Sequence, residues 1–296
     1  MKIEDYYEGV YTTYYADLAP ATVEGYEGAW RNWVEPQWRG WEMEDIRVRH
    51  INAWLAAGAG EAGYKLLRQI IRSAIADECY REDVTDPTTR GIRHPRRAKA
   101  RGEKPALTER EAKALLLGVV GWEYEATVVL GLWLGLRRSE QCGMQWGDID
   151  LRSGLVHVRR GLQRVKGEVV ETDIKTHRSA RPLMLPSTPR QRLAEIKRLY
   201  FPRARKADWV MGPNADPTRY ARMLRSHCGR NGLPYVAPKY FRHTFRTLAS
   251  KAGVPESHIQ KMLGHVSLDT TYLYMSLDET ILRQDQRQYE RHLLKA

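Results

Sequence analysis

The chain has 296 residues, 42% of them hydrophobic and 28% charged, which suits one large or two ordinary globular domains. No run approaches the roughly 18 apolar residues that a membrane span needs. The start, MKIEDYYEGVYTTYYAD, lacks the pattern of a secretion signal, so we expect a cytoplasmic protein. Three widely separated cysteines, Cys79, Cys142 and Cys228, favour reduced structural thiols over a disulfide framework.

The formal net charge of +12 indicates a polyanionic partner, either nucleic acid or an acidic membrane surface. Residues 1–89 carry 9 Lys and Arg against 16 Asp and Glu, residues 90–104 carry 7 against 1, and residues 105–296 carry 32 against 19. The basic character therefore lies in a short central segment and in the C-terminal two-thirds. We find no amphipathic anchor and no lipidation signal, so we expect no membrane partner.

Residues 1–89 predict a helical domain. Five of the nine tryptophans lie in it, at spacings more typical of core residues than of a ligand platform: Trp30, Trp33, Trp38, Trp41 and Trp54. The clearest helix is predicted from about Gly63 to Tyr80. Its apolar stripe consists of Leu67, Ile70, Ile71, Ala74 and Ile75.

Three cations line the opposite face of that helix, at positions i, i+3 and i+7: Lys65, Arg68 and Arg72. This face is a candidate DNA contact. An ordinary solvated face explains the same pattern equally well, because the domain is acidic overall. Both interpretations stay open.

Residues 90–105 predict a basic linker, because four glycines and prolines interrupt the segment and no apolar periodicity runs through it. Its cations would attract phosphate by counterion release, which favours a linker that follows the DNA backbone over a merely solvated loop. The candidate DNA-binding residues of the linker are Arg93, Arg96, Arg97, Lys99 and Arg101.

A second domain is predicted over residues 106–296. It begins with a capping box at Thr108–Glu111 and continues with an apolar helix from about Glu125 to Leu136. Alternating runs at 155–158, 168–174 and 181–185 predict a small antiparallel sheet, and helical patterns return from Pro189 onward. The fold class is therefore mainly α, with one helical domain followed by a mainly helical domain that carries a small sheet.

Four short segments of the second domain carry candidate chemistry. They are LGLRRSE at 134–140, DIKTHRSAR at 173–181, KYFRHTF at 239–245, and LGH at 263–265 followed by TTYLY at 270–274. Each alone is weak, because an arginine at a helix end or a lysine in a hairpin is usually a surface residue. Their order and spacing together are much more specific.

This set resembles the tyrosine recombinase (phage integrase) family. The family's T-G-L-R-x-S-E matches 134–140 except for Leu134, and its H/K-x-x-R-H-T-F matches 239–245. His265 follows Arg242 by 23 positions, and the family's T-T-x-x-Y places its tyrosine at Tyr274. The resemblance covers roughly residues 106–285 closely. The helical N-terminal region is only loosely similar to the family's core-DNA-binding domain.

The resemblance implies an enzyme that cuts and rejoins duplex DNA through a 3′-phosphotyrosyl intermediate, without metal, cofactor or ATP. Tyr274 would be the nucleophile, and Lys175 the general acid for the departing 5′-oxygen. Arg137 and Arg242 would each present a fork of donors to the phosphate, and His265 a further hydrogen bond. Glu140 would orient the arginine one helical turn away.

Lys239 stands where the family most often has His. It either accepts the tyrosine proton, if neighbouring cations lower its pKa, or adds positive charge at the phosphate. A register on His243 would shift the gaps to His265 and Tyr274 by four residues, so we reject it. Tyr272 is the rival nucleophile, with a poorer match to the family spacing.

The segment 277–296 predicts a polar helix with a narrow apolar stripe. It could pack on its own domain, but the resemblance favours docking on a neighbouring subunit. The resemblance further implies a dimer on each DNA site, a tetramer in the synapse, and room for an accessory directionality factor. A bacterial or phage-encoded mobile element is expected, without an N-terminal arm-binding domain. A type IB topoisomerase and a non-catalytic DNA-binding protein are the rival functions.

Overall fold

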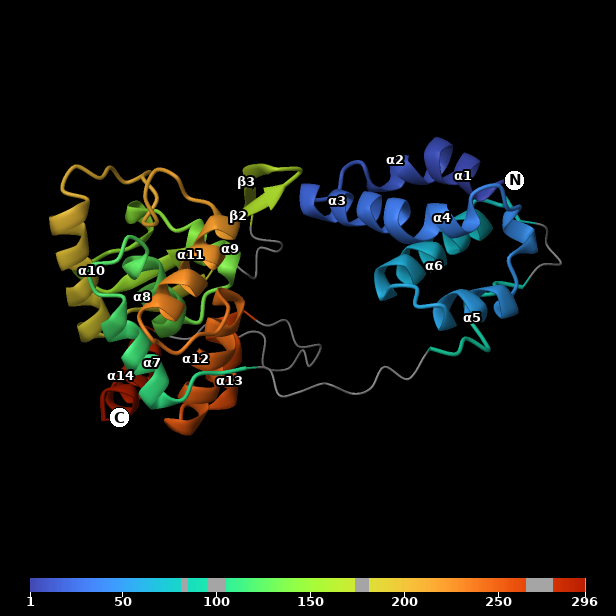
Figure 1. Ribbon diagram of the computed structural model, residues 1–296. Helices are drawn as coiled ribbons and strands as arrows, with labels where there is room; N and C mark the ends of the chain where they lie inside the picture. The colour runs from blue at the N-terminus through green and yellow to red at the C-terminus, as the bar shows by residue number, and fades with distance from the viewer. Residues whose placement is uncertain (81–84, 95–104, 174–180, 265–278, 296) are drawn as a thin grey trace. The chain divides into compact units, whose positions relative to one another are not determined.

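The computed structural model describes residues 1–80, 85–94, 105–173, 181–264 and 279–295. The chain divides into two compact units, Met1–Ala100 and Arg101–Ala296, each with its own hydrophobic core. The division falls inside the predicted linker at 90–105. Figure 1 shows the elements of both units.

The first unit is helical, as predicted. Two stretches pass without a break from α-helical to π-helical turns and back, because the residues at each junction keep right-handed helical dihedral angles. The elements are α1 (Ile3–Tyr6), η1 (Tyr7–Tyr11), α2 (Thr12–Tyr15), α3 (Pro20–Ala29), η2 (Trp30–Val34), α4 (Glu35–Trp38), η3 (Met43–Asp45), α5 (Val48–Ala56) and α6 (Glu61–Ala76).

The core of this unit is rich in aromatic residues. Trp30, Trp38 and Trp54 are buried, and Trp30 stacks on Tyr7 with ring centroids 3.8 Å apart. Trp33 is 37% exposed, but a Cβ on Gly63 would lie only 2.4 Å from its Cβ, so α6 packs closely over it. Packing is therefore the main role of these tryptophans, as the spacing predicted.

Helix α6 carries the predicted apolar stripe, which is buried except for the partly buried Ile75. The helix ends at Ala76, four residues earlier than predicted. Glu78 adopts a left-handed φ of 57°, and the carboxylate of Asp77 accepts hydrogen bonds from Tyr6 and Tyr14. These contacts to the first helices of the unit turn the chain away from the helix axis.

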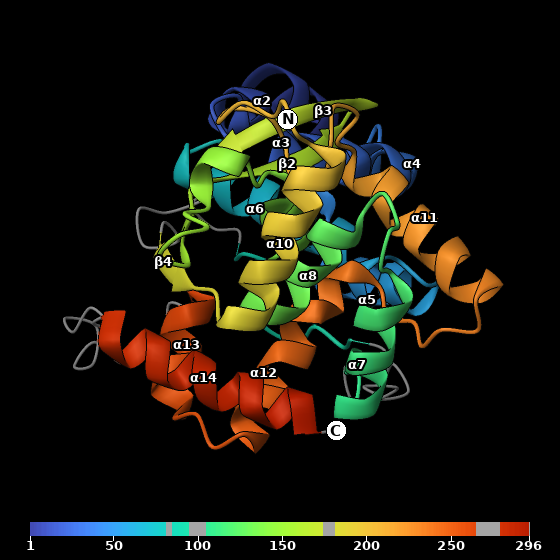
Figure 2. The ribbon, with the colours of Figure 1, turned by 90° about the vertical axis from the view of Figure 1, so that its left-hand side faces the viewer.

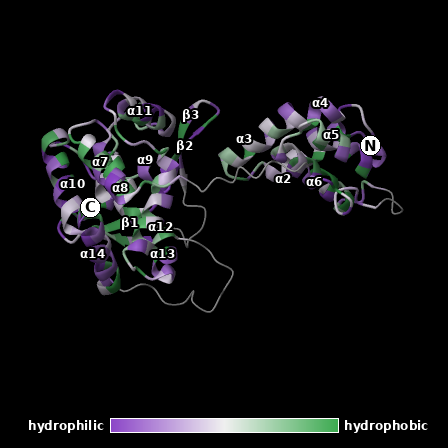
Figure 3. Cartoon of the chain, turned by 60° about the horizontal axis from the view of Figure 1, so that its bottom comes forward, coloured by the Kyte–Doolittle hydropathy of each residue, from purple (hydrophilic) through white to green (hydrophobic). Residues whose placement is uncertain are grey.

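The second unit contains the remaining helices. They are α7 (Glu109–Gly118), α8 (Glu125–Leu134), α9 (Arg138–Cys142), η4 (Trp146–Asp148), α10 (Ser187–Tyr200), α11 (Pro217–Arg230), η6 (Pro238–Tyr240), α12 (Phe241–Lys251), α13 (Glu256–Leu263) and α14 (Glu279–Lys295). The predicted capping box is present, since the Thr108 hydroxyl and backbone N–H both contact the Glu111 carboxylate at 2.8 Å. All ten residues of α8 are buried, and it lies among outer helices with mixed polar and apolar faces (Figure 3).

Two antiparallel pairs of strands complete this unit. β1 (Leu155–Val158) pairs with β4 (Arg181–Met184), and β2 (Arg160–Val165) pairs with β3 (Glu168–Asp173). The small antiparallel sheet was predicted, but β2 was not. Its sequence RGLQRV has no apolar alternation, and its place depends on Gly161, where an added Cβ would lie 3.0 Å from the Cβ of Ser139 in α9.

Helix α14 lies against its own unit, across α12 and α13 in Figure 2. Leu282, Tyr289 and Leu293 join the core, and the Tyr289 hydroxyl donates to the backbone carbonyl of Leu132 at 3.1 Å. In this single chain the helix therefore packs on its own domain, which is the alternative that the sequence left open, and docking on a neighbouring subunit stays a prediction. The apolar stripe of α14 is covered by its own unit.

Candidate active site

Arg137 lies at the junction between α8 and α9. Helix α8 ends at Leu134, and the Gly135 that follows has a left-handed φ of 61° and would bring an added Cβ within 2.6 Å of Phe245. A glycine is required there on both counts. The chain then turns into α9, and the Arg137 backbone N–H donates to the Glu140 carboxylate at 2.8 Å. The Arg137 guanidinium also contacts that carboxylate, at 2.7 Å.

Arg242 lies in the first turn of α12 and is partly buried. Its guanidinium donates to the carbonyls of Gly135, at 3.3 Å, and of Leu263. Burial, followed by the positive charges of Arg137 and Arg181, lowers the Arg242 pKa to about 9. The group still carries its charge at neutral pH, so the site concentrates positive potential that an anion would relieve.

The end of α13 holds three arginines through three successive carbonyls. Met262 accepts from Arg181 at 2.5 Å, Leu263 accepts from Arg242, and Gly264 accepts from Arg137 at 3.2 Å. The last carbonyls of a helix have no partner within the helix and carry the negative end of its dipole, so guanidinium donors suit them. The backbone of α13 thus fixes the cations directly before His265.

Glu140 is the buried anion of the site, with its side chain 4% exposed. It bridges Arg137 and Arg181, whose guanidinium contacts it at 3.0 and 3.2 Å. Burial alone would raise the Glu140 pKa, but attraction and hydrogen bonds from the two arginines outweigh it and lower the pKa to about 2. Glu140 lies where a residue that orients Arg137 must lie.

Gln141 joins the two segments that carry the candidate arginines. Its side-chain amide donates to the carbonyls of Leu136, at 2.8 Å, and Pro238, at 3.2 Å. It is fully buried, and its contact with the start of η6 fixes the approach to α12. The sequence analysis missed both Gln141 and Arg181, because the contacts that give them a role, to Pro238 for Gln141 and to Glu140 and Met262 for Arg181, span 41 to 97 positions of the chain.

Lys239 lies three positions before Arg242 and is exposed. Its ammonium group is 4.9 Å from the centroid of the Tyr240 ring. Within the described part of the chain it makes no hydrogen bond to the arginine–glutamate network. The structure thus brings Arg137, Glu140 and Arg242 together and leaves Lys239 at the edge of the group.

Three of the predicted catalytic residues, Lys175, His265 and Tyr274, lie outside the described residues, as does the rival Tyr272. Arg96, Arg97, Lys99 and Arg101 of the linker also lie outside them. The described residues next to Lys175 and His265 show where these two attach to the fold. Strand β3 ends at Asp173 and β4 begins at Arg181, so Lys175 belongs to their connection, and Gly264 directly precedes His265.

Two of the three candidate DNA-binding cations of α6 form ion pairs within their own unit. Lys65 pairs with Glu61 at 2.7 Å and Arg72 with Asp86 at 3.5 Å. The Nε of Arg68 is buried and has no hydrogen-bond partner among the described residues. In the linker, Arg93 is exposed, and its backbone N–H donates to the Asn52 side chain at 2.7 Å.

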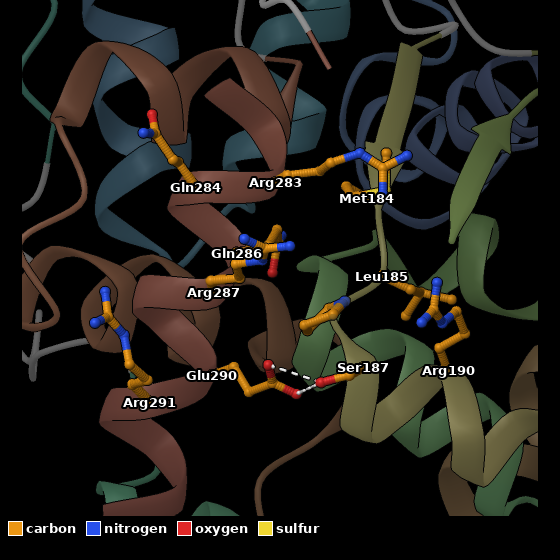
Figure 4. Close-up of a pocket in the computed structure, with 11 residues that line it drawn as sticks. Met184, Leu185, Ser187, Arg190, Arg283, Gln284, Gln286, Arg287, Glu290 and Arg291 are labelled. Atoms are coloured by element: carbon orange, nitrogen blue, oxygen red, sulfur yellow. Dashed lines mark hydrogen bonds between the residues drawn. The ribbon is translucent and has the colours of Figure 1, made fainter. Parts of the chain in front are cut away.

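A cavity of about 520 Å³ lies apart from this site, between β4, the start of α10 and α14 (Figure 4). Glu290 of α14 accepts hydrogen bonds there from the Ser187 hydroxyl, at 3.1 Å, and the Thr188 backbone N–H, at 2.7 Å. These contacts cap α10 and hold α14 in place. The cavity is lined by none of the described catalytic candidates.

Two negative findings hold for the described residues. None of their helices has both the length and the apolar character that crossing a bilayer requires. Their histidine, cysteine, aspartate and glutamate side chains form no group of three or more that could hold a metal ion.

Comparison with known proteins identifies the family. The model of the phage integrase family matches residues 107–280, more than half of the chain. A tyrosine recombinase XerC-like protein of Caldanaerobacter subterraneus is 24% identical over 85% of this chain and 73% of its own. The integrase of Mycobacterium phage D29 is 26% identical over 90% of this chain and 74% of its own.

Solved structures share the fold. The Tn1549 transposon integrase in complex with transposon right end DNA aligns over the whole of both chains, with a TM-score of 0.75 and 18% identity. A lambda integrase tetramer bound to a Holliday junction aligns over 97% of this chain and 78% of its own, with a TM-score of 0.63 and 18% identity. The four sequence segments, the paired arginines and the matched family model agree, and the chain belongs to the phage integrase family of tyrosine recombinases.

Proposed function

We propose that this chain is a site-specific recombinase that cuts and rejoins duplex DNA through a 3′-phosphotyrosyl intermediate, without metal or ATP. The observation that carries the proposal is the pair of guanidiniums, Arg137 and Arg242, held on the carbonyl end of α13 beside the buried Glu140. Two planar guanidinium donors held in fixed positions suit a phosphodiester group. Family membership supports the same chemistry.

Cleavage begins when the Tyr274 oxygen attacks the scissile phosphorus. A bond forms between this oxygen and phosphorus, and the bond to the 5′-oxygen breaks. Arg137 and Arg242 neutralise the non-bridging oxygens, and His265 donates a further hydrogen bond to them. Lys175 protonates the departing 5′-oxygen. The phosphotyrosine keeps the energy of the phosphodiester, so a 5′-hydroxyl of the partner strand can reverse the step without ATP.

The proton of Tyr274 must leave as the oxygen attacks. Lys239 stands in the segment that supplies this base in the family, and its exposed position in η6, directly before α12, is compatible with either of two roles. It accepts the proton when neighbouring cations lower its pKa, or it adds positive charge at the phosphate. A rate profile against pH for Lys239→His and Lys239→Met separates the two, because only a base leaves an ionisation in the profile.

Double-stranded DNA is the proposed partner. Both units bind it, and the linker at 90–105 runs along its phosphate backbone. We assign the core-DNA-binding role to residues 1–89 and the catalytic role to 106–296. The proposed DNA contacts are Lys65, Arg68 and Arg72 of α6 and Arg93, Arg96, Arg97, Lys99 and Arg101 of the linker. Two subunits on each site and four in the synapse are proposed, supported by the lambda integrase tetramer on a Holliday junction. An accessory directionality factor and a cytoplasmic location complete the proposal.

The test is covalent capture of DNA. The protein is incubated with a library of nicked duplexes in EDTA and without ATP, and protein–DNA adducts are isolated and sequenced. Wild type should form an adduct, Tyr272→Phe should retain it, and Tyr274→Phe should lose it. An adduct that survives in Tyr274→Phe moves the nucleophile elsewhere, and tight binding without any adduct supports a non-catalytic DNA-binding protein.

A second readout separates recombinase from topoisomerase. Two duplexes that carry the captured site should exchange strands and give recombinant products with wild type. A type IB topoisomerase would instead relax supercoiled DNA without exchanging partners. Relaxation without recombinants on paired sites would overturn the recombinase assignment while leaving the nucleophile intact.

A further inference from the structure

We propose that Arg181 is a positioning residue of the cleavage reaction, which holds Glu140 and the end of α13 so that Arg137 and Arg242 meet the phosphate. The inference rests on the proposed function and extends it to a residue outside the catalytic set. Arg181 is the first residue of β4, and its side chain is 6% exposed. With so little surface it is poorly placed to contact DNA, so its effect must pass through its neighbours.

The first neighbour is Glu140. Arg181 approaches both carboxylate oxygens, Nη1 to Oε1 at 3.2 Å and Nη2 to Oε2 at 3.0 Å. The same two oxygens receive the guanidinium and the backbone N–H of Arg137. A carboxylate has room for both arginines, because each oxygen offers two lone pairs. Arg181 therefore fixes Glu140 from one side while Glu140 fixes Arg137 from the other.

The charge of Glu140 also depends on Arg181. Burial opposes ionisation, and attraction to Arg181 is the largest effect that keeps the Glu140 pKa low. Without Arg181, the partly exposed Arg137 would be the arginine that still donates to the buried carboxylate among the described residues. A protonated Glu140 would hold Arg137 more weakly, because hydrogen bonds between ionised groups are about twice as strong as neutral ones.

The second neighbour is the last turn of α13. The Nε of Arg181 donates to the Met262 carbonyl, next to the carbonyls that hold Arg242 and Arg137. Gly264 is pressed against the same side chain, since a Cβ built on it would lie 3.3 Å from the Arg181 Cδ and Nη1. Arg181 thus ties β4, which follows the connection containing Lys175, to the turn that precedes His265.

Three variants test this assignment. Arg181→Met keeps volume without charge, and Arg181→Lys keeps the charge but cannot reach Glu140 and Met262 with one planar fork. Arg192→Met is the matched control, because Arg192 of α10 pairs at 2.5 Å with Glu125, which is as buried as Glu140. Its loss also leaves a buried carboxylate without its arginine, but away from the catalytic candidates.

The measurement is the single-turnover rate of adduct formation on the captured nicked duplex, at a temperature where every variant is folded by denaturant titration. Arg181→Met should slow adduct formation roughly 100-fold, with the DNA dissociation constant within about threefold of wild type. Arg181→Lys should lose about tenfold. Arg192→Met should stay within about threefold. Equal rates for Arg181→Met and Arg192→Met would overturn the inference.

A second substrate distinguishes positioning from a general loss of structure. In it, a methyl group replaces one non-bridging oxygen of the scissile phosphate, which removes the charge that Arg137 and Arg242 neutralise. The ratio of wild-type to Arg181→Met rates should fall well below its value on the ordinary phosphate. An unchanged ratio would mean that Arg181 acts only on stability. If wild type forms no adduct on any duplex, the proposed function itself has failed.

Discussion

Two sets of basic residues in this chain are expected to meet DNA, and they are built in opposite ways. Arg137 and Arg242 of the second unit are held by backbone carbonyls and by a buried carboxylate. Lys65 and Arg72 of α6 extend from an exposed helix face, where Lys65 pairs with the exposed Glu61 and Arg72 with the partly buried Asp86. Fixed geometry suits a transition state, whereas mobile surface charge suits a long polyanion whose position need only be approximate.

The largest expected effect comes from removing a fixed cation. Arg242→Gln should lower the rate of adduct formation by roughly 1,000-fold, because one of two guanidiniums facing the phosphate is lost. The control is Arg246→Gln, one turn along α12, where the side chain is 47% exposed and pairs with Glu256. That variant should stay within about threefold in the same single-turnover assay. Comparable losses in both would show that α12 contributes only general positive charge.

The buried anion should matter in a way that depends on pH. The folded Glu140 pKa is about 2 against an ordinary value of 4.5. A lowered carboxylate pKa adds stability that is complete above pH 4.5 and is lost as pH falls toward 2. Its contribution is on the order of 3 kcal/mol. Urea titrations should show that wild type loses more stability than Glu140→Gln between pH 5 and pH 2.5. Parallel losses would place the acid-sensitive group elsewhere.

Gly264 offers a matched pair that isolates geometry at the end of α13. Gly264 and Gly232 have left-handed φ values of 63° and 61°, so an alanine at either position should cost about 1 kcal/mol of stability. An added Cβ meets Arg181 at Gly264 but nothing within 4 Å at Gly232. Adduct formation should therefore fall about tenfold in Gly264→Ala and stay close to wild type in Gly232→Ala. Equal rates would show that the three-carbonyl arrangement tolerates movement.

The smallest effects are expected on the exposed face of α6. Lys65→Ala and Arg72→Ala should each weaken DNA binding a few-fold, equally on all sequences. Each should also reduce the slope of the logarithm of the DNA association constant against the logarithm of the salt concentration by about 1. Glu61→Gln should strengthen binding slightly, since it releases Lys65 from its partner. Fluorescence anisotropy at several salt concentrations measures both changes. Unchanged slopes would identify the face as ordinary solvated surface.

The sequence predicted features that depend on residues close together in the chain. The capping box at Thr108–Glu111, the apolar helix α8 and the glycine before Arg137 are local patterns, and the structure contains all three. Glu140 was also placed beside Arg137, because the two are three positions apart on a helix turn. Local spacing is informative where the partner is within one helical turn.

What escaped prediction depends on partners far away in the chain. The sequence placed Arg181 only at the end of a hairpin segment. No residue near it in the chain indicates a contact with Glu140 or Met262, which lie 41 and 81 positions away. Strand β2 carries too few apolar residues to be recognised and exists through its pairing with β3 and the close approach of Gly161 to α9. The sequence left open whether helix α14 packs on its own domain, and in this single chain its apolar stripe is covered by its own unit.

The carbonyl end of α13 has a consequence for how this protein tolerates mutation. Met262, Leu263 and Gly264 hold the arginines through their main-chain oxygens. A side-chain substitution cannot delete a main-chain acceptor, so the turn that organises the cations is shielded from most single changes at Met262 and Leu263 as long as the helix still packs. Substitutions in α13 can therefore change its outer surface while the positions of the three arginines that its carbonyls hold stay the same.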